Sequence, residues 1–152
     1  MQIDDTLKEL NEIKVDWLML ADRAEVVGGK LYLMGGGWDR LGLNEIPGPY
    51  TFSIATAILV PWNQTNEPHK FEMSIMDEDS TEIVKMEGGF EAGRLPGSRR
   101  GHPVRVQLAF GVTLEFKRDG GYVIDGSVNG QLLHQTRFYV VDNSKMPPQL
   151  AV

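Results

Sequence analysis

The chain has 152 residues, a length that fits one domain able to bury about two thirds of the surface its unfolded form exposes. Hydrophobic residues make up 41% and charged residues 24% of it, which excludes a wholly disordered polypeptide. A formal net charge of −6 argues against a general binder of nucleic acid or anionic membranes. The absence of cysteine excludes disulfides, thiolate metal sites and a cysteine nucleophile.

Residues 1–13 have the only helical pattern in the sequence, with Ile3, Leu7 and Leu10 on one face. We predict a short N-terminal helical arm, which needs a surface to dock on because so short a helix is marginal alone in water. The acidic start lacks the basic and apolar regions of a secretory signal, and no apolar run approaches the roughly 20 residues of a transmembrane helix. We therefore expect a cytoplasmic protein, or one incorporated into a particle assembled there, with no membrane partner.

From residue 14 onward, apolar and polar residues alternate with a period of two, which is typical of strands with one buried face. Between Val104 and Phe116 all seven even positions are apolar, and turn pairs such as Asn129-Gly130 separate the alternating runs. This pattern predicts eight strands, over residues 15–26, 30–41, 50–60, 70–77, 82–91, 104–117, 121–128 and 131–141. Eight strands with short loops favour an antiparallel, immunoglobulin-like β-sandwich over residues 14–141.

A run of three glycines, residues 35–37, interrupts one of the predicted strands. A phosphate-binding loop would lead into a helix, whereas Trp38-Asp39-Arg40-Leu41 and two nearby prolines follow here. Glycines inside a strand more often mark a bulge or a close backbone crossing, and we predict one of these rather than a ligand contact.

Two tryptophans stand where a strand meets a loop, Trp38 beside Asp39 and Trp62 beside Asn63. Aromatic rings flanked by carboxylate and amide groups can hold a sugar, so these four residues are candidates for binding a glycan or a small polar ligand. The commoner role of such aromatic residues is to close the open ends of a sandwich core.

Charge is unevenly distributed along the chain. Residues 67–91 contain eight acidic residues and two lysines, whereas residues 92–114 contain four arginines and no acidic residue. Two solvated patches are the plain interpretation. The sharper hypothesis is that the two regions attract each other between copies in a head-to-tail contact. Because the segment carrying Arg94, Arg99 and Arg100 has no aromatic residue for base stacking, it favours a protein partner or a second copy over nucleic acid.

No set of residues has the spacing of a catalytic or metal site. The acidic run Asp77–Asp79, followed by Glu82, lacks the spaced ligands and glycine of a calcium loop and predicts a solvated turn. The three histidines are never spaced for zinc on one element, and no serine lies in a nucleophile elbow. We therefore expect no enzyme, no cofactor and no bound metal.

The segment 20–32, LADRAEVVGGKLY, followed by the glycines of residues 35–37 and by Trp38, resembles the opening of an uncharacterised bacterial family of unknown function. The segments 59–63 and 121–130 look like later parts of the same pattern. The resemblance implies a small β-sandwich over residues 14–141. It supplies no known activity, ligand or catalytic residue.

Residues 142–152 form a polar, proline-containing tail with an apolar end. Because additions to a compact module often serve docking, we predict partner contacts for Leu150 and Val152, together with the three arginines. The sequence as a whole predicts a non-catalytic interaction module that binds copies of itself or decorates a larger multi-subunit assembly, such as a phage particle. A glycan-binding or small-ligand-binding sandwich is the alternative, and a hydrolase or metal-dependent enzyme is the third hypothesis.

Overall fold

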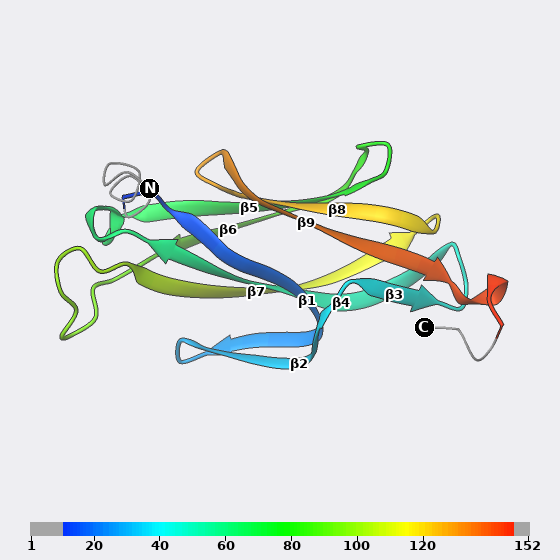
Figure 1. Ribbon diagram of the computed structural model, residues 1–152, viewed down its shortest axis with the longest axis horizontal. Coiled ribbons are helices and arrows are strands. Elements are labelled where there is room, and N and C mark those ends of the chain that lie inside the picture. The colour runs from blue at the N-terminus through cyan, green and yellow to red at the C-terminus, as the bar shows by residue number, and fades with distance from the viewer. Residues whose placement is uncertain (1–10, 148–152) are drawn as a thin grey trace, which may run out of the picture.

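Nine strands in two facing sheets make up the part of the chain that the computed structural model describes, residues 11–147 (Figure 1). They are β1 (Lys14–Val27), β2 (Lys30–Trp38), β3 (Arg40–Leu43), β4 (Gly48–Val60), β5 (Pro68–Asp77), β6 (Glu82–Glu91), β7 (Val104–Phe116), β8 (Gly120–Val128) and β9 (Gln131–Asp142). One sheet has the order β2-β1-β4-β7 and the other β3-β9-β8-β5-β6. Two short 3₁₀ helices, η1 (Trp62–Gln64) and η2 (Asn143–Lys145), follow β4 and β9. The predicted β-sandwich is confirmed.

All eight predicted strands are present, but the one expected over residues 30–41 is divided between the two sheets. β2 pairs with β1 in one sheet, whereas β3 runs parallel to β9 in the other, so the sandwich is not wholly antiparallel as expected. The reason lies in the glycine run. Gly37, with φ of +87°, is the extra residue of a bulge opposite Leu20 and Ala21, and the chain leaves the first sheet there. The predicted bulge is therefore confirmed.

The predicted N-terminal helical arm over residues 1–13 is not borne out. Residues 11–13 lead into β1 without a helix, and residues 1–10 lie outside the described part of the chain. Leu150 and Val152 also lie outside it, so their docking role stays a prediction. Within residues 11–147 we find no helix with the length and apolarity needed to cross a membrane.

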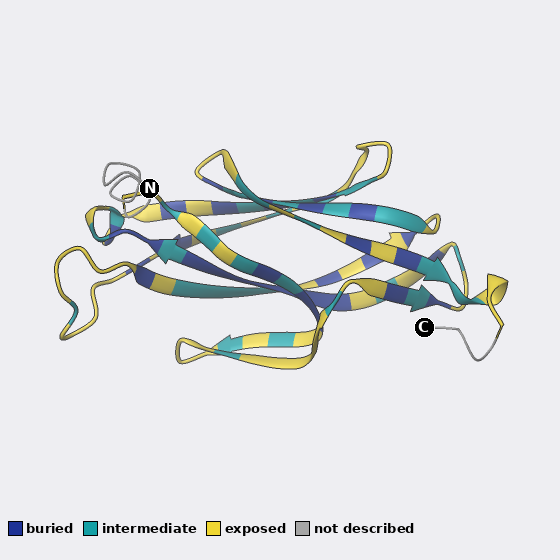
Figure 2. Ribbon diagram, viewed as in Figure 1, coloured by how far each residue is buried: buried dark blue, intermediate teal, exposed yellow. Residues whose placement is uncertain are grey.

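The core lies between the sheets and follows the period of two (Figure 2). Its largest side chains are four fully buried phenylalanines, of which Phe52 and Phe116 belong to one sheet and Phe71 and Phe138 to the other. The ring of Phe52 lies 6.4 Å from that of Phe116 and 6.1 Å from that of Phe138, centroid to centroid. Aromatic contacts therefore join the two sheets directly.

A tyrosine corner marks the sandwich as immunoglobulin-like. Tyr122, buried at the start of β8, donates a hydrogen bond of 2.6 Å from its hydroxyl to the backbone oxygen of Arg118, in the β7–β8 connection. A tyrosine at this corner that bonds back to the chain a few residues upstream is a hallmark of immunoglobulin-type sandwiches. Burial raises the pKa of this phenol above its ordinary value of 10.0, so the hydroxyl stays a donor.

The second half of β1 and all of β2 form a hairpin outside the two-layer core (Figure 1). The first half of β1 pairs with β4, and the chain then bends at Ala21 and pairs with β2 instead. At the hairpin turn the backbone oxygen of Gly29 accepts a hydrogen bond of 3.0 Å from Nε2 of Gln107 on β7. Because β4 separates β1 from β7 within the sheet, this contact shows that the hairpin folds back over the outer face of the sheet.

Candidate interaction surfaces

Trp38 packs into the edge of the core. Its ring meets that of Phe52 edge-on at 5.9 Å between centroids, and the side chain is half-buried. Its Nε1 is buried and has no hydrogen-bond partner among the described residues. Its neighbour Asp39 is exposed and accepts a backbone hydrogen bond of 2.8 Å from the amide of Tyr139. This geometry fits the closing of a sandwich edge better than an open sugar platform.

One face of Trp62 is covered by the chain itself. The guanidinium of Arg94 lies 3.9 Å from the ring centroid, donates from Nε to Oγ1 of Thr65 at 2.8 Å, and donates to the backbone oxygen of Trp62 at 3.2 Å. This cation–π contact fixes the base of the segment that follows β6. Asn63 is exposed beside it. Arg94 is therefore held in place rather than free for a partner.

The structure does not bring the two predicted tryptophan sites together. Trp38 contacts Phe52, whereas Trp62 comes two residues after β4 ends at Val60. The eight residue-to-residue steps of the strand from position 52 to 60 span about 26 Å. A ligand of monosaccharide size therefore cannot touch both rings.

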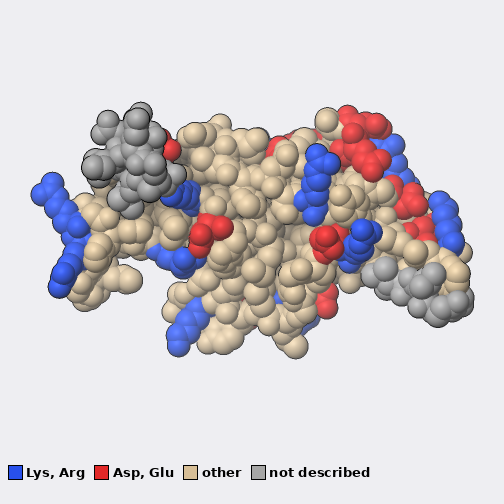
Figure 3. Space-filling view, in the orientation of Figure 1, with Lys and Arg blue, Asp and Glu red and all other residues tan. Residues whose placement is uncertain are grey.

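The segment between β6 and β7, residues 92–103, is the basic loop (Figure 1). Arg99 and Arg100 are exposed on it, and no acidic side chain of residues 11–147 pairs with either. Leu95 is 68% exposed on the same loop. In Figure 3 basic side chains protrude at the corresponding end of the molecule. Two guanidiniums without a counter-ion and an exposed leucine make this loop a candidate contact.

The turn between β5 and β6 is a structured acidic turn. Oδ1 of Asp77 accepts hydrogen bonds from the backbone amides of Asp79 (2.9 Å) and Thr81 (3.0 Å), and Arg118 pairs with both Asp77 (2.9 Å) and Asp79 (2.6 Å). The amide of Thr81, with that of Asp79 and the guanidinium, holds the pKa of Asp77 below its ordinary value. Among residues 11–147 no three acidic or histidine side chains are grouped to hold a metal ion.

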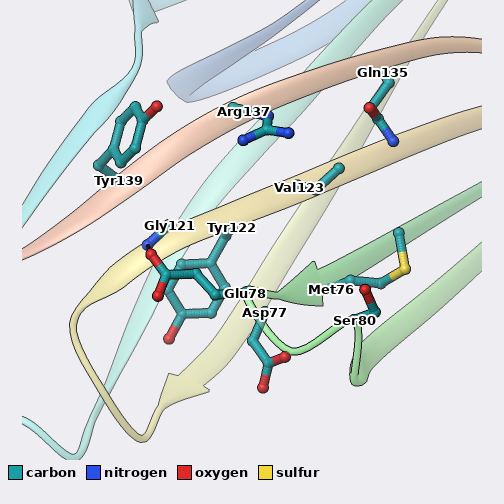
Figure 4. A pocket seen from close by; sticks show the side chains of 10 residues that line it. All are labelled: Met76, Asp77, Glu78, Ser80, Gly121, Tyr122, Val123, Gln135, Arg137 and Tyr139. Atoms are coloured by element: carbon teal, nitrogen blue, oxygen red, sulfur yellow. Dashed lines mark hydrogen bonds between the residues drawn. The ribbon is translucent and has the colours of Figure 1, made fainter.

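A hollow of about 470 Å³ lies on the outer face of the second sheet (Figure 4). Its lining comes from β5, the acidic turn, β8 and β9, and consists of Met76, Asp77, Glu78, Ser80, Gly121, Tyr122, Val123, Gln135, Arg137 and Tyr139. The strand register brings these lining residues together, since Val123 on β8 lies opposite both Met76 on β5 and Arg137 on β9. No local sequence pattern indicates this hollow, because the residues from β5 and the acidic turn are about 40 positions away from those of β8 in the chain.

The polar groups of the hollow offer hydrogen-bond donors and acceptors to a ligand. Arg137 has no ion-pair partner within residues 11–147. The Arg40 guanidinium lies over the exposed ring of Tyr139, 5.2 Å from its centroid. Across the hollow, Oε1 of Glu78 accepts the amide of Gly121 at 2.6 Å. Arginine, tyrosine and carboxylate groups around an open hollow suit a small polar molecule.

The β1–β2 hairpin exposes apolar side chains on its outer surface. Tyr32 is 57% and Met34 69% exposed, and Val27 is exposed on the same face of the hairpin. Leu33 is exposed on the opposite face. Met34 pairs with Arg23 and Tyr32 with Glu25, and these four residues share one face of the hairpin because paired residues of antiparallel strands point the same way.

β2 is also an edge strand of its sheet, so one side of its backbone is unpaired within the described sheet. Natural edge strands are usually protected by charged residues or proline, and β2 has neither from Leu31 to Trp38. The only sequence signal for this surface was the uncharged run of β2, which also fits an ordinary buried strand.

Comparisons with known proteins identify the family. The profile of a family described as a family of unknown function (DUF6941) matches residues 16–141, and no curated protein matches the chain significantly. Among solved structures, an immunoglobulin-like protein from Pseudomonas aeruginosa has a TM-score of 0.40 and 10% identity, over 86% of this chain and 97% of that one.

The Pseudomonas fluorescens alkylpurine DNA glycosylase AlkC, bound to DNA containing an abasic site analog, has a TM-score of 0.42 and 12% identity. The match covers 85% of this chain but only 30% of the glycosylase. Similarity at this level carries no argument about function. The family profile, by contrast, spans most of the sequence and agrees with the predicted resemblance to an uncharacterised family. The chain belongs to the DUF6941 family, whose function is unknown.

Proposed function

We propose that this protein is a non-catalytic interaction module that binds another copy of itself, or another protein of a larger assembly, through the β1–β2 hairpin. A phage particle is one such assembly. The observation that carries the proposal is the set of exposed apolar side chains on this hairpin, above all Tyr32 and Met34. Clustered exposed apolar residues with a polar rim are typical of protein contacts.

The composition of the hairpin surface matches the central part of a protein interface. Aromatic residues, methionine and arginine are enriched there, and Tyr32, Met34 and Arg23 lie on one face of the hairpin. Burial of the two apolar side chains would contribute about 25 cal/mol for each Å² removed from water. The unpaired edge of β2 adds backbone donors and acceptors that can extend the sheet into a partner strand.

Site-specific photocrosslinking tests the proposal. A photoreactive amino acid replaces Tyr32 in the protein made in its native cells, and in a control it replaces Leu132, an equally exposed apolar residue near the β8–β9 turn. We expect a covalent adduct from position 32 and none from position 132. The mass of the adduct distinguishes a second copy from another protein. Absence of an adduct at position 32, or equal adducts at both positions, would contradict the proposal.

A small polar ligand, such as a glycan, is a second candidate because of the hollow in Figure 4. Its exposed aromatic ring is Tyr139, rather than Trp38 or Trp62. Titration with a panel of glycans tests this candidate, with the chemical shifts of the Gln135 side-chain amide measured by nuclear magnetic resonance during the titration. We expect shifts that the Tyr139→Ala variant abolishes, and an unchanged spectrum throughout the panel would exclude glycans.

A further inference from the structure

We propose that copies of this protein also associate end to end, with the basic loop of one copy docked into the acidic end of the next. The acidic end consists of the acidic turn, the start of β6 and the end of β7. The two regions are neighbours in the sequence but lie at opposite ends of the molecule (Figure 1). The ten-residue strand β6 begins beside the acidic turn and ends at the basic loop, about 30 Å away. One copy can therefore use both ends at once. This contact is distinct from the hairpin surface.

The basic loop has the features of an inserting tip. Its base is fixed by the contact of Arg94 with Trp62 and by a backbone hydrogen bond of 2.8 Å from Asn66 to Ala92. Beyond this base, Arg99 and Arg100 are exposed and have no acidic partner among the described residues. Two unpaired guanidiniums on an anchored loop can reach carboxylates of another chain without first breaking bonds of their own.

The acidic end has a hollow of about 410 Å³ between the start of β6 and the end of β7. Glu82 and Glu115 line it, and neither has a cationic partner within residues 11–147. Glu82 only accepts a hydrogen bond of 3.0 Å from the hydroxyl of Ser74. Ile83 and Leu114 supply an apolar part of the lining. The hollow thus offers two carboxylates and an apolar surface to two guanidiniums and the exposed Leu95.

The cations of the acidic end do not cancel this complementarity. Arg118 is held by Asp77 and Asp79, and Lys145 lies 3.5 Å from the carboxylate of Asp119. Lys117 and Arg118 also line the hollow. Because two carboxylates balance the charge of Arg118, the approach of a basic loop depends on Glu82 and Glu115 together outweighing the single charge of Lys117. Because exposed ion pairs are individually weak and are screened by salt, we expect a weak and salt-sensitive contact.

An end-to-end contact uses two different surfaces and is therefore heterologous. Each copy that joins leaves one free basic loop and one free acidic end, so the assembly closes into a ring or continues as a filament. An isologous dimer, in which the same surface meets itself, would stop at two copies.

Sedimentation velocity of three charge variants tests the contact. R99E/R100E removes the basic end and E82K/E115K removes the acidic end. K70E/K85E is a control with the same charge change as the first, at two exposed lysines on strands of the second sheet that belong to neither the basic loop, the hollow of the acidic end nor the hairpin. At about 0.01 M salt we expect wild type and control to associate, and each end variant to associate at least tenfold more weakly. At about 1 M salt the end-to-end contact should be lost from all of them, and any association that remains would come from the apolar hairpin. Circular dichroism confirms that each variant is folded, and R99A/R100A replaces R99E/R100E if it is not.

Mixing the two end variants gives the decisive result. The mixture uses neutral forms, because reversed charges on both chains would recreate a second complementary contact. R99A/R100A keeps its acidic end and E82Q/E115Q keeps its basic loop, so an equimolar mixture should form a complex of two chains that cannot grow further. Salt-sensitive association that survives in either end variant, or a mixture that shows no salt-sensitive association, would overturn the proposal. A monomeric wild type at about 0.01 M salt would also overturn it, while the crosslink at position 32 would still test the hairpin surface separately.

Discussion

At the residue scale, single polar contacts fix the connections between strands. The hydroxyl of Tyr122 ties the β7–β8 connection to the core by its bond to Arg118, and the guanidinium of Arg94 ties the basic loop to Trp62. Both contacts join a buried or half-buried aromatic ring to a backbone oxygen or a cation. Such contacts hold loops in place where strand pairing has ended.

We predict that Tyr122→Phe lowers the free energy of unfolding by about 1–2 kcal/mol, because it leaves the backbone oxygen of Arg118 without its donor in a partly buried corner. Urea denaturation followed by circular dichroism measures the change. Tyr139→Phe is the control, since that hydroxyl is on an exposed side chain and its loss should change stability by less than about 0.5 kcal/mol. Equal effects of the two substitutions would contradict the assigned role.

At the element scale, the bulge in β2 decides how the first third of the chain is divided between the sheets. Gly37 has no partner residue on β1, and the next strand begins at Arg40 in the opposite sheet. The same event leaves β2 as an exposed edge and creates the hairpin that we propose as a contact surface. A local backbone conformation thus produces both the fold and its candidate binding surface.

We predict that Gly37→Ala destabilises the protein by about 1–2 kcal/mol, because φ of +87° is unfavourable for a residue with a side chain. Nothing lies within 4 Å of the added methyl group, so the cost is conformational and not a clash. Gly111 on β7 is the matched control, since its added methyl group also meets nothing within 4 Å and its φ is not positive. Thermal unfolding should show a lower Tm for G37A and an equal or higher Tm for G111A.

At the scale of the whole molecule, the aromatic core holds two sheets together while the ends stay free for contacts. Phe52 is fully buried and contacts rings from both sheets, among them Phe116 and Phe138. The candidate contacts, by contrast, lie on the hairpin, on the basic loop and in the hollows at the opposite end. Stability and recognition therefore depend on separate sets of residues, so each can be altered alone.

We predict that Phe52→Ala lowers the free energy of unfolding by about 3–5 kcal/mol, because it opens a cavity at the junction of the two sheets. Urea denaturation measures this loss. Met34→Ala, on the exposed hairpin, should change the same quantity by less than about 0.5 kcal/mol. A small effect of Phe52→Ala would show that the core does not depend on this ring.

The alternation of apolar residues was enough to predict the strands and the buried face of most of them. Successive side chains of a strand point to opposite faces, so Val112, Leu114 and Phe116 could be assigned to the core without any knowledge of their neighbours. The glycine run predicted a bulge for a similar local reason, since few other residues adopt a positive φ.

Sheet membership was decided only by the tertiary structure, because pairing between strands depends on residues that are distant in the chain. The parallel pairing of Arg40 with Tyr139, the exposure of Tyr32 and Met34, and the hollow beside Arg137 all require contacts that no local pattern encodes. The uneven distribution of charge was visible in the sequence, but the positions of the two charged segments in space were not. The length and direction of β6 turn two adjacent charged segments into the two ends of the molecule.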